Sequence, residues 1–438
     1  MFGSEINDFN LEMAAIDGYL ELIEPLAMEN FTSKYAKEIK ELSFLKDAFS
    51  KLKNVDTDLI SDECEVICEE LKASFSSATL KKEENSWAIT FQGIDATKIK
   101  TTAENIKILN TQFGLLHKSI LLNMVSAAEC FLSNILHKYF RINSDEIVGR
   151  LIENKDKIYT FNELKSFENM DDAINSIVDK KIENLIRGNF LDWIEFLKTK
   201  MDLKSNILDE YKDQITEIFQ RRNIFIHNGG NTNSIYLANV STKYQYSSTI
   251  GEQIVLSKEY LKNSLNVLVL TFSLIAFEIW RKRKIENDTR VTLLTTLSQK
   301  YMFEGKWLLT EKLTEFILID FSADNINKSM AKINSWLAKK RMGLLDKEIV
   351  RKEDLSAHSV DYQLCQAALL DDIDLVYELA NDALQSNTIS KDQLVSWPVL
   401  DEFRLTDKYT YLLNENDMLI YEEVSTIVLN NTCSSIIT

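Results

Sequence analysis

The residues of this chain best suited to chemistry are an arginine, an asparagine and a histidine close together: Arg222, Asn223 and His227. A histidine can take or give a proton near neutral pH, and an arginine stabilises charge that develops on phosphate oxygens. A cation, an amide and an imidazole that lie close together therefore suit phosphoryl chemistry. No carboxylate cluster for Mg²⁺ is needed if the nucleophile is the 2′-hydroxyl of an RNA substrate, so we expect no metal and no other cofactor.

A single helix, predicted from about residue 206 to 228, must carry these three side chains. At about 100° per residue, its apolar residues form one stripe, and Arg222 falls in the middle of it. Burying a guanidinium without a partner is costly, so we expect Arg222 to be paired or to line a wet groove. Asn223 and His227 lie four residues apart and share the stripe's edge. The stripe consists of Leu208, Tyr211, Ile215, Ile218, Phe225 and Ile226.

The sequence also predicts where this helix ends. The run Asn228-Gly229-Gly230-Asn231 predicts an abrupt end with a left-handed cap. His227 then lies in the last turn, where the free carbonyl groups favour an imidazolium.

A purely structural interpretation of the same residues stays open. Arg222 can be a core arginine satisfied by a carboxylate, and His227 a residue that ends a helix, because perturbed ion pairs are often only structural. We hypothesise that Glu129, which lies among small and apolar residues of another predicted helix, is the buried partner of Arg222. The alternative is that Glu129 is exposed on the polar side of its helix.

Composition indicates a mainly helical protein of two to four domains. The 438 residues contain only 11 Gly and 2 Pro, which is too few for the many turns of a large β-sheet protein. An apolar content of 45% is sufficient for sizeable cores. We expect a mostly helical region over 1–100, a helical bundle over 101–284, and a further helical domain with a disordered tail over 285–438.

Net charge and cysteine content limit the cellular role. A formal charge of −17 repels nucleic acid in general, so any RNA must bind in a local basic groove. Five scattered cysteines fit a reduced, cytoplasmic location, and no signal peptide is visible. The apolar stretch 265–280 is shorter than a membrane span and is predicted to be a buried helix, so we expect no membrane association.

The spacing of apolar residues predicts the remaining helices and a β element. Apolar residues at helical spacing predict a long helix over 102–142 and another from Ser257 to about Lys284, and weaker patterns predict helices over 10–30, 34–53 and 59–74. Alternation over 86–92 predicts a minor β element.

Residues 367–384 are similar to a tetratricopeptide-type helical hairpin. Cys64 and Cys68 are four apart, but no further ligand lies near them, which argues against a metal pair.

The segment Arg221-Arg222-Asn223-Ile224-Phe225-Ile226-His227-Asn228-Gly229-Gly230, with a later Tyr236-Leu237, resembles the signature of the HEPN superfamily. The closest likeness is to its RiboL-PSP-HEPN or MAE-type branch. An upstream helix containing His117 to Leu132 and a final helix opened by Leu256 to Leu261 are similar to that branch too. The resemblance covers about residues 105–284.

This resemblance implies an up-and-down helical bundle that pairs with a second copy, so that the Arg/His helices share a cleft. It implies a metal-independent endoribonuclease of a toxin–antitoxin, abortive-infection or antiviral system. Arg222 would bind and stabilise the scissile phosphate, His227 would be the general acid or base or a phosphate ligand, and Asn223 would position His227 or the phosphate. We expect Glu129, Arg221 and Asn228 to support these residues. The alternative is a non-catalytic dimerisation scaffold whose C-terminal helices bind a protein partner or antitoxin.

Overall fold

A computed structural model describes residues 1–36, 39–40, 43, 69, 75, 77–83, 86–142, 160, 163, 165, 167–203, 206–282 and 288–416. The structure is 77% helical with almost no strand, which confirms the all-α class. The chain forms two compact units, Ser4–Phe272 and Met1–Gly3 with Ser273–Thr438. The predicted three-part division, with boundaries at residues 100 and 284, stays a prediction.

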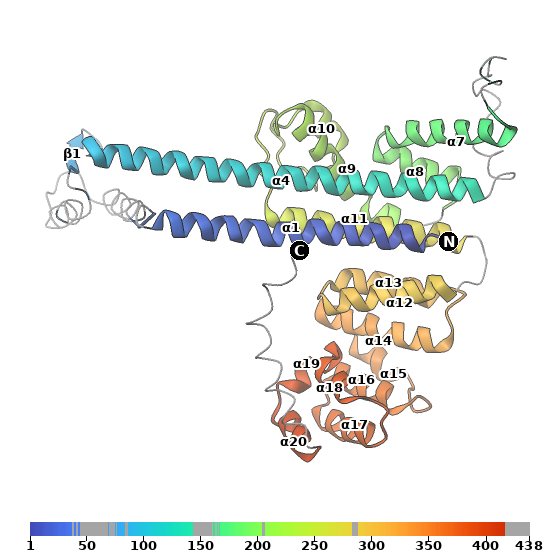
Figure 1. Cartoon of the computed structure of the whole chain (residues 1–438). Coiled ribbons are helices and arrows are strands. Elements are labelled where there is room, and N and C mark those ends of the chain that lie inside the picture. The colour runs from blue at the N-terminus through green and yellow to red at the C-terminus, as the bar shows by residue number, and fades with distance from the viewer. Residues whose placement is uncertain are drawn as a thin grey trace, which may run out of the picture. The chain divides into compact units, whose positions relative to one another are not determined.

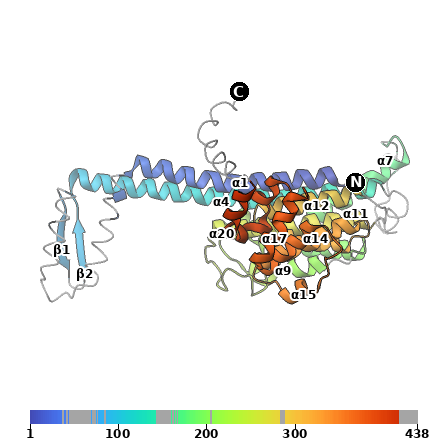
Figure 2. The same ribbon diagram turned by 90° about the horizontal axis from the view of Figure 1, so that it is seen from below.

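The unit Ser4–Phe272 is organised around two long antiparallel helices, α1 (Gly3–Lys34) and α4 (Gly93–Ile142) (Figures 1 and 2). Lys138 of α4 contacts Glu5 near the start of α1 at 2.5 Å (Nζ–Oε1). Further along the pair, the rings of Phe9 and Phe131 stack with their centroids 4.3 Å apart. The predicted apolar face of α4 is buried from Ile120 onwards, so α4 offers one continuous wall to the rest of the unit.

In the described part of this unit, the further helices are α7 (Met170–Ile186), α8 (Phe190–Thr199), α9 (Asn206–His227), α10 (Ser234–Asn239) and most of α11 (Lys258–Arg281). Their aromatic side chains form the centre of the core. Phe219 of α9 stacks on Phe190 at 5.6 Å and meets Trp193 edge-on at 5.2 Å, and Phe272 of α11 packs against the same two rings. This core fixes α9, the helix that bears the candidate site, against α8 and α11.

A small hairpin is the β-structure of the described part of the chain. Strand β1 (Thr79–Glu83) pairs antiparallel with β2 (Ser86–Thr90), with Leu80 opposite Ile89. The predicted β element near 86–92 is thus confirmed as β2. Its partner β1 was not predicted, because the lysine-rich sequence of 79–83 shows no alternating apolar pattern.

The unit formed by Met1–Gly3 and Ser273–Thr438 begins with three helices that pack on one another: α12 (Asp288–Phe303), α13 (Trp307–Ile319) and α14 (Asn325–Arg341). A fully buried, bidentate pair joins the start of α12 to the end of α13, because Arg290 donates to both oxygens of Asp320 at 2.7 and 2.6 Å. Both side chains are fully buried, so this arginine is used structurally.

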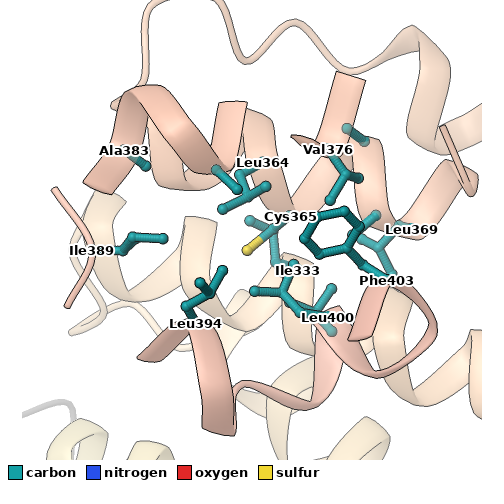
Figure 3. Packing of buried hydrophobic residues seen from close by; sticks show 14 of the residues in the cluster. Ile333, Leu364, Cys365, Leu369, Val376, Ala383, Ile389, Leu394, Leu400 and Phe403 are labelled. Atoms are coloured by element: carbon teal, nitrogen blue, oxygen red, sulfur yellow. The ribbon is translucent and has the colours of Figure 1, made fainter. Parts of the chain in front are cut away.

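Shorter elements follow: α15 (Lys347–Lys352), α16 (Val360–Leu370), α17 (Ile373–Gln385), α18 (Lys391–Ser396), a 3-10 turn at Pro398–Leu400, α19 (Asp401–Arg404) and α20 (Asp407–Glu415). The pair α16–α17 turns at Asp371, whose φ is 63°, so the predicted helical hairpin near 367–384 is confirmed. Figure 3 shows the core of this region around Cys365 and Phe403. Its likeness to a tetratricopeptide repeat stays a prediction.

Two helices are long and apolar enough to cross a membrane by length and composition. One is α11, and 83% of its most apolar window is buried within the protein; the other lies within α4, where 56% of the window is buried. The buried helix predicted from the apolar stretch 265–280 is therefore present as a core helix.

Several predictions concern residues outside the described part of the chain. These are the Cys64–Cys68 pair, most of the helices expected over 34–53 and 59–74, and the C-terminal tail. The first predicted helix, 10–30, is longer than expected at both ends, since α1 spans Gly3–Lys34.

Candidate active site

Helix α9 ends as its sequence predicts. Gly229 and Gly230 adopt φ values of +60° and +89°, which a side chain would disfavour. The amide of Gly230 donates to the carbonyl oxygen of Ile224 at 3.2 Å, closing the last turn. A Cβ atom on Gly230 would also lie 2.8 Å from Cε1 of Phe225. The position therefore needs glycine, and this cap fixes His227 in the final turn.

The apolar stripe on α9 is confirmed along most of its length, but Ile226 is 43% exposed and was wrongly assigned to it. Ile224 is buried instead, in a small cluster with Tyr236, Val240 and Ile254. The reason is that the segment after the cap folds back over a different side of the helix. The covered face of α9 therefore changes in its last turn.

Arg222 is paired with Glu129, the partner that we hypothesised, so the contact itself is confirmed (salt bridge between Nη2 and Oε1). Both side chains are only partly buried, with about a fifth of each exposed (20% and 21%). The Nε atom of Arg222 is buried and has no hydrogen-bond partner among the described residues. The guanidinium is thus paired on one side, while its buried Nε is left without a partner among the described residues.

Arg222 lines a cleft of about 390 Å³ between α4, α8 and α9. The charged members of its wall are Glu129, Arg187 and Arg222. Arg187, which is largely exposed, also contacts Glu183 at 2.5 Å (Nη2–Oε1). The cleft therefore offers two guanidinium groups, each paired with a carboxylate, on an otherwise acidic chain.

A row of polar side chains on α9 forms one side of this cleft. Thr216, Gln220 and Asn223 all line it, and their spacing of four and three residues puts them on one face. Thr216 is buried, and its hydroxyl has no hydrogen-bond partner among the described residues. His227 continues the same row, four residues beyond Asn223 and about 6 Å further along the helix axis.

His227 itself does not line the cleft. Its side chain is exposed and contacts no charged or hydrogen-bonding group within the described ranges. The structure therefore brings Arg222, Asn223 and Glu129 together, and leaves His227 one turn outside them. Asn228, a predicted supporting residue, donates from Nδ2 to the carbonyl of Asn231 at 2.5 Å and so contributes to the cap.

Arg221, the other predicted supporting residue, lies in a separate buried network outside the cleft lining. Its Nε donates to Glu217 at 2.5 Å, and its guanidinium lies 3.8 Å from the ring centroid of Tyr260. Tyr236 and Tyr260 donate their hydroxyls to the same carboxylate at 3.0 and 2.8 Å. Four side chains from α9, α10 and α11 thus satisfy one another.

Burial shifts the ionisation of both groups of residues. Burial raises the pKa of Glu129, and the neighbouring Arg222 only partly opposes this shift. In the buried network, burial and the charge of Glu217 raise the pKa of Tyr260 well above its usual range, and they raise that of Tyr236 as well. Both phenols therefore stay protonated and act as hydrogen-bond donors to Glu217.

Sequence reasoning missed the cleft residues that lie on other elements: Arg187, Asn189 and Asn239. Asn189 precedes α8 and forms a capping box with Asp192, which is visible as Asn-x-x-Asp in the sequence. That signal indicates a helix start and not a site. On α9 itself, the polar row formed by Thr216, Gln220, Asn223 and His227 could have been found from its spacing.

No metal centre is apparent near these residues. In the parts of the chain that the structure describes, no group of three or more His, Cys, Asp and Glu side chains is arranged to hold a metal ion. The chain was also compared with known proteins. No protein-family model, no curated protein and no solved structure matches the chain.

Proposed function

We propose that residues of about 105–284 form a HEPN-like bundle and that the protein is a metal-independent endoribonuclease. The observation that carries this proposal is Arg222, a partly open guanidinium with a free buried Nε donor in a polar cleft. A structural arginine is expected to be enclosed, as the fully buried Arg290 is in its bidentate pair with Asp320, whereas a fifth of the Arg222 side chain is exposed. In keeping with the resemblance, we place the protein in the cytoplasm as an antiviral or toxin effector.

The proposed chemistry follows from the side chains. The 2′-oxygen of RNA attacks the adjacent phosphorus and the bond to the 5′-oxygen breaks, giving a 2′,3′-cyclic phosphate and a 5′-hydroxyl. Arg222 stabilises the charge on the phosphate oxygens, and Asn223 positions the phosphate. His227 accepts the proton of the 2′-hydroxyl or donates one to the 5′-oxygen.

A second copy of the chain completes this site in the proposal. Because His227 is exposed and one turn away from Asn223, a single chain brings together only part of the required set of Arg222, Asn223 and His227. Two α9 helices facing each other across a two-fold axis would place the imidazole of each copy beside the arginine cleft of the other. The partners are thus RNA and a second copy.

The test is RNA cleavage by purified full-length protein in the presence of EDTA. We expect wild-type protein to cleave and the His227→Ala variant to lose the activity while keeping its unfolding transition. His358→Ala is the matched control, because His358 is another exposed histidine of this chain and lies on a different unit. Cleavage that requires Mg²⁺, or a fully active His227→Ala variant, would refute the proposal.

One observation favours a second function, a non-catalytic scaffold. Glu129 already occupies the guanidinium of Arg222, as expected of a purely structural pair. In that case the bundle serves dimerisation, and the C-terminal helices bind a protein partner or an antitoxin. Expression separates the two functions, since a toxic wild type rescued by His227→Ala supports the nuclease and a harmless wild type supports the scaffold.

A further inference from the structure

The unit that contains α12 to α20 has a cavity of its own, of about 290 Å³, at the lower end of the size range of small-molecule sites. Three aromatic side chains line it: Phe303 at the end of α12, Tyr362 on α16 and Trp397 before the 3-10 turn. Phe303 is 58% exposed, so one of these rings lies at the mouth. The nuclease proposal makes no use of this cavity.

The charged side chain in the wall of this cavity is acidic. Asp361 is the acidic residue among the lining residues, and no lysine, arginine or histidine is among them. Its carboxylate accepts a hydrogen bond from the hydroxyl of Ser359, and no ion pair to it occurs in the described ranges. Burial raises the pKa of the Cys365 thiol, which also lines the cavity, to about 12, so that thiol remains neutral. The wall thus offers one uncompensated anion.

Aromatic faces together with a single carboxylate recognise one kind of ligand. The negative face of an aromatic ring attracts a cation, and alkylammonium groups are held in this way by aromatic cages. A carboxylate adds direct charge attraction, and the acidic chain disfavours anionic ligands. Met302 and Met330 in the same wall supply adaptable apolar contacts for methyl groups.

We propose that this cavity binds an organic ammonium ion, with Phe303, Tyr362 and Trp397 facing its alkylated nitrogen and Asp361 supplying the counter-charge. The site is separate from the Arg222 cleft, and it does not depend on the nuclease proposal. A nucleotide or another phosphorylated ligand does not fit, because no basic side chain lines the cavity.

The experiment compares choline with 3,3-dimethylbutan-1-ol, its uncharged isostere, for binding to the full-length protein by ligand-observed NMR and calorimetry. We expect choline to bind roughly tenfold more tightly than the alcohol, since the two differ only in charge. Asp361→Asn should reduce choline affinity about fivefold and leave the alcohol unchanged. Asp407→Asn is the control, because it removes the same charge from a helix start outside the cavity.

A second variant separates the aromatic contribution from folding. Phe303 is largely exposed, so Phe303→Leu keeps an apolar side chain at little risk to the fold. We expect it to weaken choline more than the alcohol. No saturable binding of choline, or equal binding of choline and its isostere by the wild type, would overturn the proposal.

Discussion

Two adjacent arginines of α9 have opposite surroundings. Arg221 is 5% exposed, and its network with Glu217, Tyr236 and Tyr260 is closed. Among the described residues, Arg222 pairs with Glu129 and lines a cleft, and its buried Nε has no hydrogen-bond partner. The same residue type is therefore used once to join three helices and once in a position where it can bind a ligand.

This difference teaches how to separate a structural arginine from a functional one. The buried carboxylate of Glu217 accepts hydrogen bonds from Arg221, Tyr236 and Tyr260, so removing one of these groups costs stability. The Arg222 cleft is incompletely matched, so removing its groups should cost binding or catalysis more than folding. Substitutions at the two arginines should therefore have different effects on stability and on activity.

The largest expected effect is that of Arg221→Ala on stability. The substitution leaves the carboxylate of Glu217, which is 3% exposed, without its cation. We expect the free energy of unfolding to fall by about 3–5 kcal/mol, the usual result of breaking a buried pair. Urea denaturation followed by circular dichroism measures this change. A loss no larger than that of Arg222→Ala would abolish the contrast.

Next in size is the effect of Arg222→Ala on RNA cleavage. We expect a loss of roughly 100- to 1,000-fold, the scale found when a group that stabilises a developing oxyanion is removed. Stability should change by only about 1 kcal/mol, because the Arg222–Glu129 pair is partly exposed to water. Initial cleavage rates on a labelled RNA measure the first effect. Arg141→Ala, on α4 and 60% exposed, serves as the control and should retain full activity.

A smaller effect is expected for Tyr236→Phe. The hydroxyl donates to Glu217 and accepts a hydrogen bond from the amide of Tyr246 at 3.2 Å, so its loss removes one donor from a buried carboxylate and one acceptor from a partly buried amide. We expect destabilisation of about 1–2 kcal/mol with cleavage unchanged. Loss of activity in a stably folded Tyr236→Phe protein would show that the buried network takes part in the chemistry.

The smallest effect concerns pH and Glu129. Because its folded-state pKa is raised, the folded protein holds this proton more tightly than the unfolded chain does, and the stability contribution of Glu129 improves as pH falls through that pKa. Protonation also releases Arg222, so RNA binding by wild type should strengthen a few-fold over the same interval. Glu129→Gln should bind RNA with little dependence on pH. Parallel pH curves for the two proteins in filter binding would contradict this account.

Local signals in the sequence predicted the positions that depend on a single helix. The end of α9 at His227 followed from Asn228-Gly229-Gly230, and the need of Arg222 for a partner followed from a cation on an apolar stripe, whereas the choice of Glu129 on another helix was a hypothesis. The helical class followed from the scarcity of glycine and proline. Each of these inferences uses periodicity or composition, which tertiary packing seldom reverses.

What could not be predicted depends on contacts between distant segments. Arg187 and Asn239 join the cleft through the packing of α7 and α10, which no spacing in the sequence reveals. Ile226 is exposed because the chain after the cap covers Ile224 instead. The pattern also gave no hint that Thr216 would be left with an unpaired buried hydroxyl. The HEPN resemblance and the nuclease activity remain proposals.

The most direct test of the nuclease account uses a DNA oligonucleotide that contains one ribonucleotide, incubated with full-length protein in EDTA. The account predicts cleavage only after the ribonucleotide, with a 2′,3′-cyclic phosphate on the upstream product, and no cleavage when that 2′-hydroxyl is replaced by hydrogen. Cleavage of the all-deoxy strand, or a product with a 5′-phosphate, would contradict attack by the 2′-oxygen at the Arg222 cleft.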